Sequence, residues 1–417
     1  MWKPSRRYVI AVLLLTLAGC VVVRATREPP PPPFLFGTLE TLPEHAATEA
    51  AHGIRVAMLE ADWGSYEPAD GRFDDAYAQR LRERIASYRA AGMRVTLGLG
   101  LHYTPAWLLR DPGSRLVDQH GNRSAGLNLV FSRRMREKAA RYLSRLDRDL
   151  DLSSFWALRL TSGAQPEVLY PPGGSYWAFD PGAQNGPDRP PGVAPNPLPG
   201  WRPGDRSVPV TEIRTWADWY VHSLAGVVTW QIDLLSGLGF TGYFQVLTPG
   251  AGSKPFTYAR DIAEYLPDGI TGVGAVWHVF YAALPANPRL IAYVSSMADE
   301  PGQPHLCDPG DREVPLTDPR VSGWPATRWL TRVAAGHGFG LSGENPGLDF
   351  PARLNGHYRD TSPRGMMAAG VQEMASCGFQ GFYWAHDQQL WDRRPWNGTG
   401  AFERYADLIA KVNAGRE

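Results

Sequence analysis

The stretch that decides the fold runs from Ile54 to Leu101. It opens with the apolar run IRVAML at Ile54–Leu59, continues through apolar residues at helical spacing in Phe73–Ala91, and ends with RVTLGLGL at Arg94–Leu101. This order predicts a buried strand, a helix closed by Gly92 and a second buried strand. A strand, a helix and a strand in succession are typical of a parallel sheet covered by helices.

The same alternation continues along the chain and predicts an α/β fold. Further strands are expected at Phe34–Leu39, Phe155–Leu160, Phe240–Leu247, Gly338–Leu341 and Gly378–Trp384, with one more at either Thr271–Trp277 or Leu290–Val294. Further helices are expected at Glu44–His52, Arg133–Leu146, Thr211–Leu238, Ala326–Ala335 and Gly365–Ser376. At 417 residues, a closed (β/α)8 TIM barrel with long loop insertions is the form that fits this pattern.

Two irregular insertions interrupt the alternation, at Pro171–Val210 and Ala298–Pro325. The first is rich in Pro and Gly and also contains Trp177, Phe179 and Trp201. Long loops of this kind in compact domains are often functional. The aromatic residues would either form a wall of a cleft or pack onto the rim of the barrel, and the sequence leaves both interpretations open.

The N-terminus has the pattern of a signal peptide. A basic start is followed by the apolar run Tyr8–Ala18, and LAGC, which ends at Cys20, resembles the bacterial lipobox. The resemblance implies lipidation of Cys20 and an exported protein anchored to the membrane, although Val21–Val23 extends the run and leaves an uncleaved anchor as an alternative. Pro29–Pro33 predicts a stiff spacer. We therefore expect a signal peptide at 1–20, a linker at 21–33 and one barrel domain at 34–417.

Composition favours a neutral ligand. Lys plus Arg and Asp plus Glu are both 42, so the net charge is zero and nothing points to nucleic acid. The 15 Trp, 17 Tyr and 15 Phe would suit a cleft for sugar rings or a large core. No glycine-rich phosphate motif, HExxH or paired CxxC occurs, so no metal or organic cofactor is expected. Cys307 and Cys377 would lie on the exported side, where a disulfide is permitted, but their spacing does not decide whether they pair.

The candidate catalytic residues are two glutamates that follow predicted strands. Glu167 lies in ALRLTSGAQPEVLY (Ala157–Tyr170), and Glu344 lies in GFGLSGENPG (Gly338–Gly347). Catalytic groups of barrel enzymes sit at the carboxyl ends of the strands, and glycoside hydrolysis needs two carboxyl groups. Candidate substrate-binding residues follow the same rule: Glu60, which is also the rival acid, Trp63, His102, Trp107, Gln165, Trp277, His278, Asn345, Trp384, expected to be a sugar platform, and His386.

Two segments and the run FYWAH in the last predicted strand resemble clan A glycoside hydrolases, especially the β-galactosidase-like families such as family 42. The segments are GIRVAMLEADWGSYEPADGRFDD (Gly53–Asp75) and GMRVTLGLGLHYTPAWLL (Gly92–Leu109). The positions that carry the resemblance are Trp63, Glu67, Pro68, Gly71, Phe73, Pro105 and Trp107. It implies retaining cleavage of β-linked oligo- or polysaccharides, with Glu167 as acid/base after strand four and Glu344 as nucleophile after strand seven.

The sequence departs from that family at one position and resembles a second family. Clan members usually have Asn before the acid/base, whereas this chain has Pro166. The contact of that Asn with the sugar 2-hydroxyl must therefore come from elsewhere, with Gln165 as a candidate, or be absent. SGAQPEVLYPP, together with the later SGEN, is also similar to β-amylases. Those enzymes hydrolyse α-glucans with inversion of the anomeric configuration, and their two acids follow the same two strands. The alternatives are therefore an inverting α-glucan hydrolase and a non-catalytic carbohydrate-binding lipoprotein.

Overall fold

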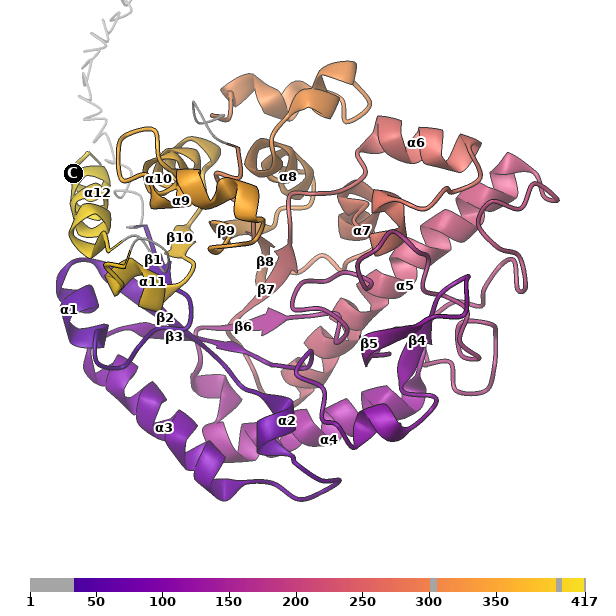
Figure 1. The fold of residues 1–417 in the computed structure, drawn as a ribbon, viewed down its shortest axis with the longest axis horizontal. Helices are drawn as coiled ribbons and strands as arrows, with labels where there is room; N and C mark the ends of the chain where they lie inside the picture. The colour runs from indigo at the N-terminus through magenta and orange to yellow at the C-terminus, as the bar shows by residue number, and fades with distance from the viewer. Residues whose placement is uncertain (1–33, 301–305, 395–399, 416–417) are drawn as a thin grey trace, which may run out of the picture.

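The computed structural model describes residues 34–300, 306–394 and 400–415, and its centre is a closed barrel of eight parallel strands (Figure 1). Around the barrel the order is β1-β2-β3-β6-β7-β8-β9-β10. The strands are β1 Phe36–Thr38, β2 Ile54–Glu60, β3 Arg94–Gly98, β6 Ala157–Leu160, β7 Tyr243–Thr248, β8 Leu290–Val294, β9 Gly340–Glu344 and β10 Gly381–Trp384. A hairpin of β4 (Arg115–Val117) and β5 (Arg123–Leu127) lies outside the barrel. The predicted (β/α)8 barrel is confirmed.

The structure decides which segment supplies the sixth strand. Leu290–Val294 is β8, and all five of its residues are buried between β7 and β9. The competing segment Thr271–Trp277 instead contains the last three residues of the 3-10 turn η3 (Ile270–Val273) and the first residue of α7. Gly274, which has φ of +78°, turns the chain there. A β-branched and aromatic run therefore formed the strand, whereas a run interrupted by glycine did not.

Helices surround the barrel, as Figure 1 shows. They are α1 Ala46–Ala51, α2 Trp63–Tyr66, α3 Asp75–Ala90, α4 Arg133–Leu150, α5 Val210–Gly237, α6 Pro255–Ala263, α7 Trp277–Ala282, α8 Ala326–Ala335, α9 Asn355–Arg359, α10 Met366–Cys377, α11 Asp387–Trp391 and α12 Phe402–Ala414. Local signals set several boundaries: the side chain of Asp74 caps α3, that of Ser132 caps α4, and Gly378 with φ of +74° ends α10. The predicted helices are confirmed to within a few residues at their ends.

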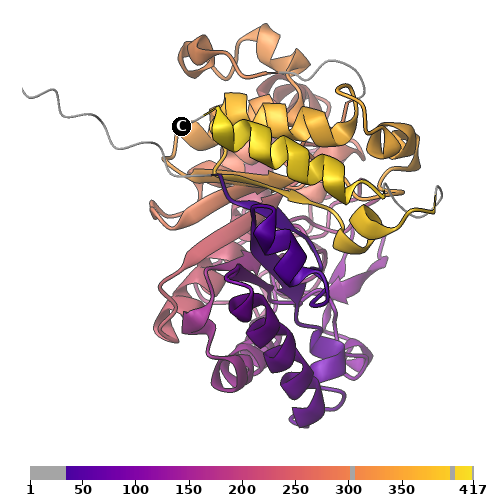
Figure 2. The same ribbon diagram turned by 90° about the vertical axis from the view of Figure 1, so that its left-hand side faces the viewer.

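The last helix, α12, packs against both the first and the last strand of the barrel. The hydroxyl of Tyr405 on α12 lies 3.2 Å from the carbonyl oxygen of Gly37 in β1 and 3.0 Å from that of Phe382 in β10. Figure 2 shows α12, in yellow, on the same side of the molecule as α1, in indigo. The two ends of the described chain therefore meet at one seam of the barrel.

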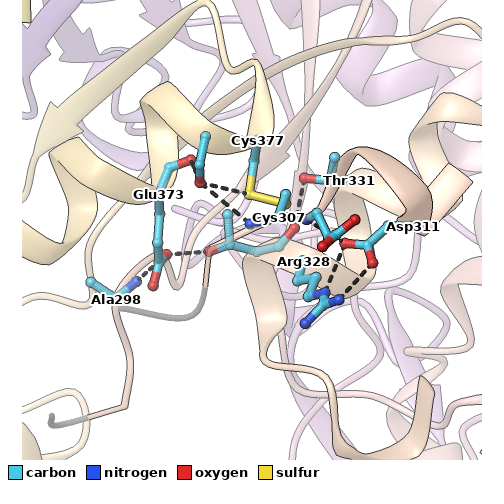
Figure 3. Close-up of a disulfide and its surroundings, with 10 residues drawn as sticks. Ala298, Cys307, Asp311, Arg328, Thr331, Glu373 and Cys377 are labelled. Carbon is cyan, nitrogen blue, oxygen red and sulfur yellow. Dashed lines mark hydrogen bonds and ion pairs between the residues drawn. A yellow bond between two sulfur atoms is a disulfide. The ribbon is translucent and has the colours of Figure 1, made fainter. Parts of the chain in front are cut away.

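A disulfide fastens the second insertion to the barrel. Cys307 is bonded to Cys377 at the end of α10, which answers the pairing that their spacing left open (Figure 3). Nearby, the carboxylate of Glu373 on α10 accepts a hydrogen bond of 2.9 Å from the backbone N–H of Ala298. Arg328 on α8 forms an ion pair of 2.6 Å with Asp311. The insertion is therefore held to α8 and α10 at several points.

The first insertion packs against α5. Trp177 and Trp201 are each only 6% exposed, and Trp201 lies edge-to-face with Trp216 of α5 at 5.3 Å. These indoles therefore pack onto the rim of the barrel, one of the two alternatives that the sequence allowed.

Within the described residues, no helix is both long and apolar enough to cross a membrane. The predicted signal peptide, Cys20 and the linker at 21–33 lie outside the described residues.

Candidate active site

A cavity of about 680 Å³ opens at the carboxyl ends of the barrel strands. This volume falls within the range of roughly 300 to 1,000 Å³ that is usual for small-molecule sites. Its wall brings together six of the residues selected from the sequence: Glu60, His102, Glu167, Glu344, Asn345 and His386. Residues more than 280 positions apart in the sequence thus share one wall because the parallel strands all end at this face.

Glu344 is the last residue of β9, and a buried ion pair fixes its carboxylate. Nη2 of Arg159, on β6, donates a hydrogen bond of 3.0 Å to Oε2 of Glu344. Arg159 is 4% exposed, and its guanidinium lies 4.9 Å from the ring centre of the buried Tyr293. Burial opposes the charge of Arg159, but the surrounding carboxylates, Glu344 first, raise its pKa overall. A guanidinium that stays charged favours the ionised form of its carboxylate partner.

Glu167 lies on the loop that follows β6, where the chain bends back on itself. The backbone N–H of Ser162 donates a hydrogen bond of 3.2 Å to the carbonyl oxygen of Glu167, and the N–H of Val168 donates one of 2.9 Å to Leu247 in β7. Burial raises the pKa of the Glu167 carboxyl, and the nearby charge of Glu344 raises it further, although Arg159 opposes the shift. The environment of Glu167 therefore favours the protonated form.

Glu60 is a third carboxyl group in the cavity. Burial raises its pKa to about 7, and the charges of Glu40 and Glu344 add to the shift, while Arg159 opposes it. Its side chain lies directly against the backbone of Gly98 in β3, where a Cβ atom would approach Oε2 of Glu60 to 2.0 Å. Gly98 therefore leaves the space that the Glu60 carboxyl fills, and any larger residue there would displace it.

The other three predicted residues complete the wall in different ways. Burial lowers the pKa of His102 to about 4, which keeps its imidazole neutral at physiological pH. Nδ1 of His386 lies 3.4 Å from Oε2 of Glu40, and this contact lowers the pKa of Glu40. The amide of Asn345 is engaged by backbone, since its Oδ1 accepts from Ala385 N–H at 3.0 Å and its Nδ2 donates to Pro346 at 2.9 Å. Asn345 therefore joins the ends of β9 and β10.

The remaining predicted substrate-binding residues lie outside the cavity wall: Trp63, Trp107, Gln165, Trp277, His278 and Trp384. Trp63 is fully buried and donates a hydrogen bond of 2.7 Å to Glu67, and Trp107 donates one of 2.8 Å to the carbonyl oxygen of the same residue. Trp384 is also fully buried, with its ring 4.9 Å from that of Tyr358. The indole predicted to be a sugar platform therefore packs in the core and presents no face to the cavity.

Trp277, His278 and Gln165 take part in packing and in turns instead. Trp277 is fully buried and contacts Phe280 at a ring distance of 5.5 Å. Burial lowers the pKa of His278 to about 4, and its ring lies beside that of Tyr258. The backbone N–H of Gln165 donates to the hydroxyl of Ser162 at 3.0 Å, within the bend that carries Glu167.

Several residues of the wall were not predicted from the sequence: Glu40, Arg159, Ser295, Asp299, Phe350 and Arg353. Arg159 had a visible signal, because it is the one charged residue in the apolar strand ALRL. A charge is rarely buried without a partner, so an arginine within such a run predicts a carboxylate inside the barrel. Phe350 and Arg353 lie between β9 and α9, in a segment without strand or helix periodicity to mark its position.

Among the described residues, no group of three or more His, Cys, Asp or Glu side chains is arranged to hold a metal ion. The charged and titratable groups of the cavity wall are carboxyl groups, two arginines, two histidines and a tyrosine.

Comparison with known proteins adds a fold but no sequence family. No protein-family model matches this sequence, and no curated protein matches it significantly. Among solved structures, the chain is similar to the catalytic domain of β-amylase from Paenibacillus polymyxa, with a TM-score of 0.56 and 14% identity over 91% of this chain and 98% of that one. It is also similar to the β-galactosidase from the psychrophilic Marinomonas ef1, with a TM-score of 0.57 and 14% identity over 91% of this chain.

A third similar structure is the β-galactosidase from the Antarctic haloarchaeon Halorubrum lacusprofundi, with a TM-score of 0.55 and 15% identity over 92% of this chain. The alignments span only 59% and 58% of the two β-galactosidase chains. The resemblance to β-galactosidases and β-amylases that was drawn from sequence segments is therefore confirmed as a shared fold.

Proposed function

We propose that this chain is a glycoside hydrolase that cleaves β-linked glycosidic bonds with retention, using Glu167 as general acid/base and Glu344 as nucleophile. The observation that carries the proposal is the pairing of two unlike glutamates in one cavity. Arg159 pairs with the carboxylate of Glu344 at 3.0 Å, while burial raises the pKa of Glu167 and favours its protonated form. A carboxylate that attacks and a carboxylic acid that protonates the leaving oxygen are the two groups that retaining hydrolysis requires.

The first step follows from these positions. The carboxylate of Glu344 would attack the anomeric carbon while the proton of Glu167 passes to the glycosidic oxygen, which leaves with the second sugar. Water, activated by the now ionised Glu167, would then break the glycosyl ester and restore both groups. Arg159 would hold the attacking oxygen in position during both steps.

Matched glutamine variants test the assignment. Glu344→Gln should lose at least about 1,000-fold in kcat on 4-nitrophenyl β-glycosides, and Glu167→Gln about 100- to 10,000-fold. Glu83→Gln, on the exposed face of α3, is the control and should match the wild type. Wild-type levels of turnover in both cavity variants would contradict the assignment, and Glu60→Gln would then be the next acid to examine.

The pH dependence gives a second test of the same roles. Because the protonated form of Glu167 acts in the first step and its pKa in the free enzyme is raised above the ordinary value of 4.5, the alkaline limb of kcat/KM should lie above pH 4.5. Azide should restore turnover of an activated aryl glycoside in Glu167→Gln, because this nucleophile needs no general base.

One observation favours a second candidate, an inverting α-glucan hydrolase. The chain aligns with 98% of the β-amylase catalytic domain, compared with 59% of the Marinomonas β-galactosidase. Proton NMR of the first product formed would separate the two, since retention gives the anomer of the substrate and inversion gives the opposite one. Binding of oligosaccharides without any turnover would instead indicate a carbohydrate-binding protein.

We also propose that the protein is exported and lipidated on Cys20. The lipobox-like LAGC supports this proposal, and the disulfide is in keeping with an oxidising compartment. Labelled palmitate should enter the wild type in a bacterial host but not Cys20→Ser. Labelling of both proteins, or of neither, would contradict lipidation at this residue.

A further inference from the structure

An exposed aromatic ring stands at the mouth of the cavity. Phe350 lies between β9 and α9 and is 75% exposed, yet it belongs to the same wall as Glu167 and Glu344. Exposing an apolar side chain of this size to water is unfavourable, and this ring is exposed at the rim of a polar cavity. Nothing in the catalytic step proposed above uses this ring.

The backbone around Phe350 is held in place. Its neighbours Leu348 and Leu354 are 7% and 1% exposed, so both sides of the turn are anchored in the core. Asp349 and Asn355 bond to each other twice, from Asp349 N–H to Oδ1 at 2.8 Å and from Nδ2 to Asp349 Oδ1 at 2.6 Å. A turn clasped in this way presents the ring to the solvent from a defined position.

A second exposed ring lies on the other side of the mouth. Tyr103 follows β3, is 38% exposed and also lines the cavity. In the closed barrel β3 and β9 are four strands apart, so the loops after them face each other across the opening. The floor beneath is polar and buried, formed by Arg159 and the acids near it. The cavity therefore has a charged bottom and an aromatic entrance.

The reacting sugar ring and the leaving group of a bound substrate would lie at different depths in the cavity. The ring that reacts must reach Glu344, whose side chain is 12% exposed and is paired with the buried Arg159. A group attached to this ring through the glycosidic oxygen would extend toward the mouth of the cavity, where Phe350 is exposed. A pyranose ring has an apolar C–H face that stacks on an aromatic ring and hydroxyl groups that bond to polar neighbours.

The charge of the wall indicates which sugars fit. It contains five carboxyl groups and two guanidinium groups: Glu40, Glu60, Glu167, Asp299 and Glu344, against Arg159 and Arg353. An excess of acids disfavours a uronic acid or a sulfated sugar and accepts a neutral one.

We propose that Phe350 is the stacking platform for a neutral sugar ring on the leaving-group side of the scissile bond, so that the chain acts on disaccharides or longer glycans. This inference rests on the glycoside hydrolase function proposed above and specifies its substrate. The platform contributes binding to the second ring alone, because the reacting ring lies deeper in the cavity.

Paired substrates with and without a second ring test the platform. Lactose and cellobiose provide a second sugar, whereas β-galactosyl and β-glucosyl fluoride carry the same reacting ring with only fluoride as leaving group. Phe350→Ala should lower kcat/KM for the cleaved disaccharide about 10-fold, and that for the matching fluoride less than about 2-fold, which is the difference expected for one lost ring contact. Phe350→Trp should retain most of the wild-type value.

The control is Phe256→Ala on α6, because Phe256 is 69% exposed and lies outside the cavity wall. It should leave both substrates unchanged. An equal loss on both substrates, or no loss on either, would overturn the platform while leaving the hydrolase function intact.

A binding measurement separates this inference from a failure of the hydrolase function. If the wild type cleaves none of these substrates, the hydrolase function fails, and titration calorimetry with lactose, cellobiose and maltose still tests Phe350. Affinity lost in Phe350→Ala and kept in Phe256→Ala would support a sugar platform. Unchanged affinity, or no binding of any of the three sugars to the wild type, would overturn it.

Discussion

The two sides of the cavity are built differently, although each presents one glutamate. On the β9 side, Glu344 ends a strand, its carboxylate pairs with Arg159 at 3.0 Å, and its carbonyl oxygen accepts a hydrogen bond of 2.8 Å from Met297. On the β6 side, Glu167 follows the strand by seven residues, and among the described residues it forms no ion pair. One carboxyl group is fixed by an ion pair, whereas the other is held by turns and has a raised pKa.

This contrast explains how one pocket keeps two like groups in different states. A carboxylate that is paired with a cation carries a charge that raises the pKa of a neighbouring carboxyl group. The pKa of Glu167 follows that logic, since burial and then the charge of Glu344 raise it. The two glutamates therefore differ in two ways: Arg159 pairs with Glu344 alone, and burial raises the pKa of Glu167.

Removing that arginine should lower both stability and turnover. Arg159→Met leaves Glu344 buried without its cation, so the free energy of unfolding should fall by about 3 to 5 kcal/mol. The kcat should fall on the order of 100-fold, because the attacking oxygen loses its position. Urea denaturation and initial rates measure the two effects.

The double variant Arg159→Met/Glu344→Gln is the control for this change. It removes both charges, so it should recover much of the stability lost in Arg159→Met while remaining inactive. If the double variant were as unstable as the sum of the two single variants, the pair would not be coupled and the contrast between the two sides would fail.

The second difference is covalent, since the disulfide fastens the insertion after β8 on the Glu344 side. The bond between Cys307 and Cys377 closes a loop of 70 residues, for which chain entropy predicts a stabilisation of about 4 kcal/mol. Cys307→Ala/Cys377→Ala should therefore unfold at lower denaturant concentration. Turnover at 25 °C should stay close to that of the wild type, because β9 and Arg159 still hold Glu344.

Reduction of the wild type is the matched control. Dithiothreitol should lower the denaturation midpoint of the wild type to that of the double alanine variant and leave the variant itself unchanged. A wild type whose midpoint does not respond to the reductant while its thiols become reactive would show that the insertion needs no tether.

The third carboxyl group, Glu60, tests whether Arg159 also stabilises the charge of a neighbouring acid. Its pKa is raised from 4.5 to about 7 by burial, so between these pH values the folded protein binds a proton that the unfolded chain has lost. The contribution of Glu60 to the free energy of unfolding is therefore lost as the pH rises from 4.5 to 7, by about 3 kcal/mol.

Glu60→Gln removes this titration. Between pH 4.5 and pH 7, the free energy of unfolding of the wild type should therefore fall by about 3 kcal/mol more than that of the variant. Urea denaturation of both proteins at the two pH values measures the difference. Parallel pH dependences would mean that Glu60 is solvated and that Arg159 or water already stabilises its charge.

The sequence predicted the barrel better than it predicted the contents of the cavity. Strands such as Ile54–Glu60 are predicted by apolar runs that lie between helices ending in glycine. Because these strands are parallel, they bring Glu167 and Glu344 to one face of the barrel. Thr271–Trp277 competed with Leu290–Val294 because both are apolar runs of strand length. Only packing between neighbouring strands decided in favour of the second.

The aromatic residues were the hardest to place from the sequence. Trp384 follows the rule for a strand end, yet it is fully buried, whereas Phe350 follows no rule and is 75% exposed at the cavity mouth. A strand residue alternates between the two faces of the barrel wall, so one position decides whether its side chain enters the core or the cavity. A loop residue is placed by its turn, and the hydrogen bonds of that turn are tertiary information.

An exposed ion pair at the same rim provides the smallest and most discriminating test of the comparison. Glu40 and His386 lie 3.4 Å apart, and their side chains are 57% and 32% exposed, whereas the pair of Arg159 and Glu344 is buried. Contact with His386 lowers the pKa of Glu40 below 4.5, so its contribution to stability is present above that pH and is lost as the pH falls.

Glu40→Gln should cost less than about 1 kcal/mol at neutral pH, because water screens the pair. Added salt should weaken that small effect further and leave the effect of Arg159→Met almost unchanged, since a buried pair is shielded from ions. Equal salt dependence in the two variants would mean that burial does not distinguish them and that the fixed charge on Glu344 needs another explanation.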